Sequence, residues 1–322
     1  MSRLLITGAN GFLGSALCQK AILVGEPVRG TDRQKSSPVT GLEYISADIT
    51  NPISLKPVVK DVDIVVHAAG LAHVFGKIKS NAPNFSVVND IGTANIARAV
   101  AESGAAHFVL ISSVSVYGFF ARGLIDETFS CRPLDPYAES KYRAEQRSIE
   151  IAQKYRMALT ILRLVTLYGE GDPGNVSRLM RAIDRGRFIY FGNGLNRKNL
   201  LHREDAALAC LAVVRRPPLG VRIYNVSAPP CTMREVVEVI SRALGKRRPP
   251  ISIPALIAKR ISALFSIMPI IRLKDISITM KKMLADDIYD SRKFKNEFNF
   301  QTRVNLEDGL CREVAMYRRI GS

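Results

Sequence analysis

A glycine-rich turn at residues 7–14 joins the first apolar run of the chain to its first helical pattern. Gly8 permits a tight turn, Gly11 lets the backbone come close to a phosphate, and Gly14 lets the helix pack against the strand. The unpaired N–H groups that begin such a helix attract phosphate oxygens. The turn and its context therefore predict a dinucleotide-binding strand–helix unit.

Apolar runs alternate with helical patterns through the first half of the chain. The expected strands are Arg3–Gly8, Pro27–Asp32, Leu42–Asp48, Asp63–Gly70, His107–Ser113 and Ala158–Leu164. The expected helices cover Phe12–Val24 and Asn84–Ser103, and a third starts near Tyr137. This alternation predicts an α/β fold with a parallel sheet and right-handed crossovers.

The end of the second predicted strand carries a carboxylate that bears on the cofactor. Asp32 stands 18 residues after Gly14, where it can accept both ribose hydroxyls of an adenosine and repel a 2′-phosphate. This favours NAD, although Arg33 beside it could receive a 2′-phosphate and leaves NADP open. Asp48 and Ile49, at the end of the third strand, could meet the adenine ring, but an ordinary strand-end aspartate looks the same.

A catalytic pair is expected at the start of the helix near residue 137. Tyr137 and Lys141 are four residues apart and therefore lie on one helix face. A nearby ammonium is expected to lower the pKa of the phenol, so that Tyr137 can move a proton near neutral pH. Ser113 ends a buried strand, where open α/β sheets bind their ligands, and can hydrogen-bond the reacting oxygen.

Four motifs occur in one order: TGxxGxxG at residue 7, HAAG at 67, SSVSVYG at 112 and YxxxK at 137. With them the chain resembles the extended short-chain dehydrogenase/reductase family, and most closely its nucleotide-sugar epimerases, dehydratases and reductases. The resemblance implies a Rossmann-type, doubly wound parallel sheet, in which residues 1–168 form mainly an NAD(P)-binding Rossmann domain. Residues 169–322 would form mainly a smaller C-terminal α/β substrate-binding lobe, interleaved with the sheet.

The motifs and the resemblance together give the expected site. Tyr137 is the acid/base, Lys141 holds the nicotinamide ribose and Ser113 faces the substrate. The expected cofactor-binding residues are Gly8, Asn10, Gly11, Phe12, Leu13, Gly14, Asp32, Arg33, Asp48, Ile49, Ala68, Ala69, Gly70, Tyr137 and Lys141. The expected substrate-binding residues are Ser113, Tyr137, Arg197 and Lys198. Lys198 stands at the position of the family's diphosphate-binding arginine, and Arg197 beside it could take that role. No cluster has metal-ligand spacing, and no metal is expected.

The resemblance also narrows the reaction. Family dehydratases usually carry an Asp-Glu pair directly after the active-site Ser or Thr, where this chain has Val114 and Ser115. That favours an epimerase or a 4-ketoreductase of the UDP-hexose or UDP-N-acetylhexosamine type. The alternatives are a hydroxysteroid-like or other lipophilic-alcohol dehydrogenase, and a non-catalytic cofactor-binding protein.

The charge of the chain bears on its partners. The net charge is +17, and residues 162–322 hold 29 Lys and Arg against 15 Asp and Glu, a net of +14. This favours an anionic substrate such as a nucleotide-diphosphate sugar, or contact with an anionic membrane. No nucleic-acid motif is present, and no nucleic acid is expected as a partner. The apolar, basic segment 254–282 predicts either two packed helices or an interfacial helix.

Assembly and location are also inferred. The resemblance implies a homodimer that pairs through helices 84–103 and 137–156. Five scattered cysteines without a CxxC pair, no secretion signal and no long apolar span favour a cytoplasmic location.

Overall fold

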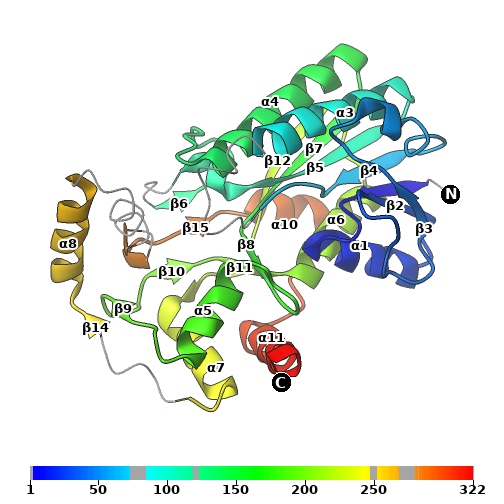
Figure 1. The fold of residues 1–322 in the computed structure, drawn as a ribbon. Coiled ribbons are helices and arrows are strands. Elements are labelled where there is room, and N and C mark those ends of the chain that lie inside the picture. The colour runs from blue at the N-terminus through cyan, green and yellow to red at the C-terminus, as the bar shows by residue number, and fades with distance from the viewer. Residues whose placement is uncertain are drawn as a thin grey trace.

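A seven-stranded parallel sheet forms the centre of the computed structural model (Figure 1), which describes residues 3–72, 85–118, 123–246, 252–267, 280–281 and 283–321. The strand order is β12-β7-β5-β4-β1-β2-β3. These strands are β1 (Leu4–Thr7), β2 (Val28–Asp32), β3 (Glu43–Ser46), β4 (Ile64–His67), β5 (His107–Ser113), β7 (Ala158–Leu164) and β12 (Val221–Val226).

Helices cover both faces of the sheet (Figure 1). On one face, α3 (Thr93–Glu102) packs beside α4 (Pro136–Tyr155), and on the other α1 (Phe12–Leu23) packs beside α6 (Arg203–Arg215). Because both faces are covered, the central strands are mostly apolar, and every residue of β1 and β4 is buried. The predicted Rossmann-type fold is confirmed.

The order in which strands are added to the sheet reverses at β1. The chain first adds β2 and β3 on one side and then β4, β5, β7 and β12 on the other. Residues at the carboxyl ends of β1 and β4 lie opposite each other, as Thr7 pairs with His67 in the parallel register. Open α/β sheets bind ligands at such a switch point, so a ligand is expected at the edge of the sheet where the glycine-rich turn begins.

The chain after residue 168 contributes both to the sheet and to a separate set of small elements. Strand β12 joins the edge of the main sheet beside β7, and α6 packs on α1. The expected division into two domains near residue 168 stays a proposal. In that division, β12 and α6 belong to the second part of the chain but pack on the first. The smaller strands are β6 (Leu124–Ile125), β8 (Thr166–Tyr168), β9 (Tyr190–Phe191), β10 (Arg197–Lys198), β11 (Leu200–His202), β13 (Cys231–Thr232), β14 (Ser252–Ile253) and β15 (Ile288–Tyr289). The further helices are α5 (Asn175–Asp184), α7 (Met233–Ala243), α8 (Ala255–Ile267), α10 (Arg292–Phe298) and α11 (Leu306–Gly321).

Two expected segments differ in detail. The helix expected over residues 84–103 begins in the structure with a π-helical stretch, η2 (Ser86–Gly92), before α3. The segment expected to form two packed helices or an interfacial helix contains α8, while residues 268–279 and 282 lie outside the described residues. In the described part of the chain, no helix has both the length and the apolar character needed to cross a membrane.

Candidate active site

Helix α4 carries the expected catalytic pair. Its start is set by Asp135, whose side chain accepts a hydrogen bond from the backbone N–H of Ala138 at 2.8 Å, and by Pro136 in the first turn. Tyr137 is half-buried at this end of the helix. Lys141, one turn further, is buried and donates its ammonium to the backbone carbonyl of Ile111 at 2.9 Å. The helix is therefore fixed to strand β5 through Lys141.

Strand β5 brings Ser113 to the same place. Ser113 ends the strand and caps the short 3-10 helix η3 (Val114–Tyr117), where its Oγ accepts a hydrogen bond from the N–H of Ser115 at 3.1 Å. The Ser113 hydroxyl is near enough to the Tyr137 phenol to lower its pKa. The structure thus places all three expected catalytic residues at the carboxyl edge of the sheet.

The pKa of Tyr137 differs from the expectation. Burial raises the pKa of Tyr137 to about 12. The nearby Ser113 hydroxyl lowers this pKa in part, and the charge of Asp135 raises it further. Lys141 was expected to lower this pKa, but its ammonium is directed to the Ile111 carbonyl. Burial lowers the pKa of Lys141 itself to about 8, opposed by the charge of Glu145. Desolvation therefore outweighs charge proximity in this structure.

The loop after β4 closes the other side of the site. A Cβ on Gly70 would lie 3.0 Å from the Asn89 Oδ1 and 3.3 Å from the Lys141 Nζ. Asn89, in the π-helical stretch, accepts a hydrogen bond from the N–H of Leu71 at 2.7 Å and donates to the Ser140 Oγ at 3.0 Å. Asn89 thereby ties the loop to the catalytic helix.

The glycine-rich turn has the geometry of a phosphate loop. Gly8 has a φ of +69°, which favours glycine, and a Cβ on Gly14 would lie 2.0 Å from the Gly8 carbonyl oxygen. Gly11 begins α1 without any side-chain cap, and the first turn of α1 has no acidic residue. The buried Oδ1 of Asn10 has no hydrogen-bond partner among the described residues. The open helix start and this unpartnered oxygen fit a dinucleotide.

The remaining expected cofactor residues lie along the same edge. The Asp32 carboxylate accepts from the N–H of Asn10 at 3.3 Å and from that of Arg33 at 2.8 Å, which holds it next to the phosphate loop. Asp48 is exposed and caps its own turn by accepting two hydrogen bonds from Thr50. Three further expected cofactor residues are exposed: Gly11, Arg33 and Gly70. The others are buried or half-buried: Phe12, Leu13, Ile49, Ala68 and Ala69.

The two expected diphosphate partners lie in β10, which pairs with β13. Arg197 is exposed and forms an ion pair with Asp286 at 2.9 Å. Lys198 is largely buried, and its ammonium lies 3.8 Å from the Asp287 carboxylate. Burial lowers the pKa of Lys198, whereas the charges of Asp287 and Asp286 raise it. A diphosphate at this strand would have to compete with Asp286 and Asp287.

A buried ion pair behind the catalytic strand was not predicted. Glu145 and Arg163 are both buried and share two hydrogen bonds, at 3.0 and 2.6 Å. The Ser112 hydroxyl donates to the same carboxylate, and Arg163 donates to the Tyr117 hydroxyl at 2.9 Å. Glu145 follows Lys141 by four residues on α4, so helical spacing was the available signal.

His67 is a second feature that sequence reasoning passed over. Its ring lies between two hydroxyls, with Nδ1 2.7 Å from the Thr7 Oγ1 and Nε2 3.0 Å from the Thr93 Oγ1. Burial lowers the pKa of His67 to about 3, with a further lowering from the charge of Lys141. Burial also lowers the pKa of His107 to about 4. Both imidazoles are therefore neutral in the folded protein near pH 7.

These histidines predict a loss of stability in acid. Below an unfolded-state pKa of about 6.5 the unfolded chain takes up protons that the folded chain excludes, so the free energy of unfolding falls as the pH drops. Each histidine should contribute about 2 kcal/mol of this loss between pH 7 and pH 5. Urea unfolding at both pH values measures it. His67→Gln should remove one such share, and an unchanged pH dependence in that variant would contradict the assignment.

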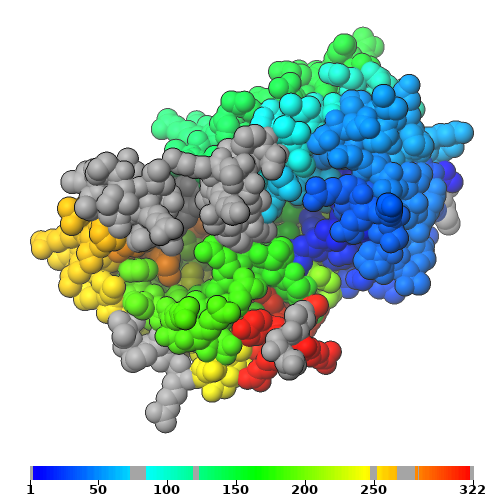
Figure 2. All heavy atoms as spheres, in the orientation of Figure 1, coloured from blue at the N-terminus to red at the C-terminus, as the bar shows by residue number. Residues whose placement is uncertain are grey.

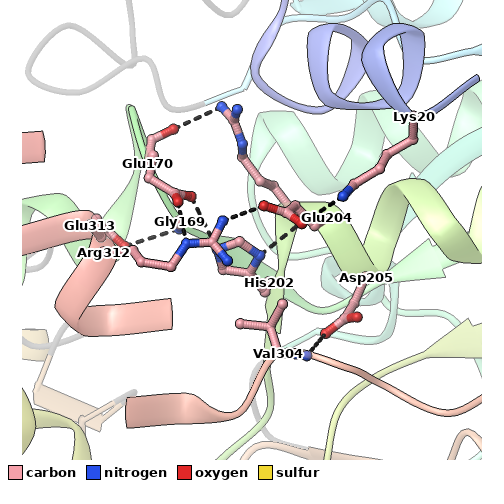
Figure 3. Close-up of polar contacts among 10 residues, drawn as sticks. Lys20, Gly169, Glu170, His202, Glu204, Asp205, Val304, Arg312 and Glu313 are labelled. Carbon is pink, nitrogen blue, oxygen red and sulfur yellow. Dashed lines mark hydrogen bonds and ion pairs between the residues drawn. The ribbon is translucent and has the colours of Figure 1, made fainter. Parts of the chain in front are cut away.

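A polar cluster joins the C-terminal helix to the rest of the protein (Figure 3). Arg312 of α11 pairs with both Glu170 and Glu204, and Lys20 of α1 pairs with Glu204 at 2.8 Å. Glu170, His202 and Glu204 bring possible ligand atoms within 4.8 Å of one another. The two cationic side chains already balance these carboxylates, so we assign no metal to the cluster. The neighbouring Asp205 accepts hydrogen bonds from the backbone of residues 303 and 304.

Comparison with known proteins agrees with this geometry. Residues 4–227 match the model of the NAD dependent epimerase/dehydratase family. The chain belongs to this family. It is an NAD-dependent enzyme, and its cofactor is NAD.

Several members of the family resemble the whole chain. A 2-alkyl-3-oxoalkanoate reductase of Stenotrophomonas maltophilia is 29% identical, over 96% of this chain and 98% of the relative. The N-acetyl-alpha-D-glucosaminyl-diphospho-ditrans,octacis-undecaprenol 4-epimerase of Escherichia coli O157:H7 is 28% identical, over 96% and 93%. The solved structure of MoeE5 in complex with UDP-glucose and NAD is 25% identical, with a TM-score of 0.76 over the full length of both chains.

Proposed function

We propose that this enzyme is a sugar 4-epimerase that acts on a diphosphate-linked sugar of the UDP-hexose or UDP-N-acetylhexosamine type. The observation that carries the proposal is the placement of Tyr137 against Ser113, with Lys141 fixed one helix turn away. The likeness to MoeE5 with UDP-glucose and to the Escherichia coli 4-epimerase supports this substrate class. A preformed 4-keto sugar would make the same site a 4-ketoreductase.

The residues of the site would divide the chemistry as follows. The Tyr137 oxygen, in its deprotonated form, would take the proton of the C4 hydroxyl and later return it, while the Ser113 hydroxyl would hold the reacting oxygen by a hydrogen bond. The Lys141 ammonium would favour this deprotonated form against the burial that raises the pKa of Tyr137. NAD, when bound, supplies the acceptor and donor of hydride. The phosphate loop from Gly8 to Gly14, with Asp32, would hold its adenosine diphosphate.

The position after Ser113 argues against elimination of water from the sugar. Val114 is buried in the core and Ser115 carries no carboxylate. An elimination needs an additional acid or base to remove and deliver protons. The proposed reaction needs only the proton transfer at Tyr137.

Proton NMR of the enzyme with NAD and UDP-N-acetylglucosamine or UDP-glucose tests the proposal. The C4 epimer of one sugar should appear without net formation of NADH. If neither sugar changes, the epimerase proposal fails. Oxidation of NADH by a 4-keto sugar nucleotide would then identify a 4-ketoreductase.

A second candidate function has its own support. The relative from Stenotrophomonas is named a 2-alkyl-3-oxoalkanoate reductase, which favours a lipophilic ketone or alcohol as substrate. The same Tyr137 would then protonate the reduced carbonyl oxygen. Consumption of NADH with a 2-alkyl-3-oxoalkanoate, and none with the sugar nucleotides, would favour this function. A homodimer and a peripheral contact with an anionic membrane also stay proposals.

A further inference from the structure

Helix α8 (Ala255–Ile267) turns large apolar side chains toward solvent. Leu256, Ile257 and Leu264 are 63%, 49% and 55% exposed. Its inward side carries the buried Ala258 and Ser262 and the half-buried Ile261 and Phe265. A surface helix of a globular protein normally turns its large apolar side chains to the core and its polar ones to water. In α8, large apolar side chains lie on the outward side as well, where Leu256, Ile257 and Leu264 form a second apolar face turned to solvent.

Positive charge lies within and around this face. Lys259 and Arg260 are exposed, and the spacing of Leu256, Arg260 and Leu264 places them on one side of the helix. The stretch 252–267 contains no acidic residue. In the wider segment 246–282, nine Lys and Arg stand against one Asp. An apolar face with basic residues beside it complements a surface that has anionic groups above an apolar interior.

The helix lies at the edge of the protein. Figures 1 and 2 show it at the end of the molecule away from β2 and β3. The preceding strand β14 pairs with β9, and a cavity beside the helix is lined by Lys259 together with Asn196 and Asp286. Asp286 is the ion-pair partner of Arg197. The face is therefore close to the strand that carries the expected diphosphate partners.

We propose that the outward face of α8 docks on an anionic phospholipid membrane. Leu256, Ile257 and Leu264 enter the boundary of the acyl chains, and Lys259 and Arg260 contact the headgroup phosphates. Two copies of this face would bring like charges together across a symmetric interface. A nucleic acid would satisfy the charges but leave the aliphatic side chains in water. The proposal deepens the membrane contact named above but does not depend on which substrate Tyr137 acts on.

The absence of tryptophan from the chain gives a direct test. Leu256→Trp creates a single fluorescent reporter on the outward face of α8. Vesicles of phosphatidylcholine and phosphatidylglycerol should shift its emission to the blue at low salt, and brominated lipids should quench it. Pure phosphatidylcholine vesicles should give at least about tenfold weaker binding, and high salt should weaken binding to the anionic vesicles.

Matched variants make the test specific. Leu219, 85% exposed in the turn before β12, provides the control, and Leu219→Trp should show neither a shift nor quenching. In sedimentation, the variant with Leu256→Glu and Leu264→Glu should bind anionic vesicles at least about tenfold more weakly than the wild type, whereas Leu219→Glu should bind like it. Turnover of a water-soluble substrate should be equal in all of these proteins, which separates this proposal from the proposed function. No shift at position 256, or equal sedimentation of the Leu256→Glu/Leu264→Glu variant and the wild type, would overturn it.

Discussion

Tyr137→Phe is expected to abolish turnover while leaving the fold and NAD binding intact. The change removes only the hydroxyl, which is the group that exchanges a proton with the substrate in the proposed reaction. Positioned acid–base catalysis is worth about 10²- to 10⁴-fold, so we expect a loss of roughly 10³-fold or more. The ring itself can stay, because Phe85 packs against its edge at 5.9 Å between ring centroids. The NMR assay measures turnover, and calorimetry measures the affinity for NAD.

The same helix offers a matched control. Tyr155 lies at the far end of α4, and its hydroxyl is 3.3 Å from the exposed Glu102 carboxylate. Tyr155→Phe removes an identical group without touching the site and should retain wild-type turnover. If Tyr137→Phe kept turnover within a few-fold of the wild type, Tyr137 could not be the acid/base, whichever substrate is correct.

The sheet could be predicted because its strands are buried on both faces. Runs such as Asp63–Gly70 and His107–Ser113 are mostly apolar, without alternation of polar residues, and a parallel sheet with helices on both sides produces this pattern. The proposed catalytic residues could be placed at the edge of the sheet for a related reason. Ser113 ends a buried strand and Tyr137 begins a capped helix, so local sequence signals place both at an edge of the sheet.

Properties that depend on the environment of a side chain were harder to infer. The spacing of Tyr137 and Lys141 shows that they share a helix face, but it gives neither their burial nor the direction of the ammonium. The pKa of Tyr137 was therefore expected in the wrong direction. The π-helical start of the 86–102 helix was also missed. In this stretch Asn89 contacts Leu71 and Ser140, and these residues come near it only in the folded chain.

The buried pair of Glu145 and Arg163 was missed for the same reason, since its partners come from α4 and β7 and meet only in the folded chain. Glu145→Gln should lower the free energy of unfolding by about 3–5 kcal/mol, because it leaves the Arg163 charge buried without a counter-ion. Urea unfolding measures the loss. Glu139→Gln breaks the exposed pair with Arg143 on the same helix and should cost less than about 1 kcal/mol.

A variant that removes both charges separates the two possible roles of this pair. Glu145→Leu combined with Arg163→Met keeps much of the side-chain volume and should recover most of the stability lost in Glu145→Gln, since no charge remains buried alone. Turnover should not recover with it. The Glu145 charge raises the pKa of Lys141, and its carboxylate accepts a hydrogen bond from Ser112, the neighbour of Ser113. Stability that returns without activity would show that the pair positions the catalytic residues, whereas recovery of both would show that its only role is to avoid an unpaired charge.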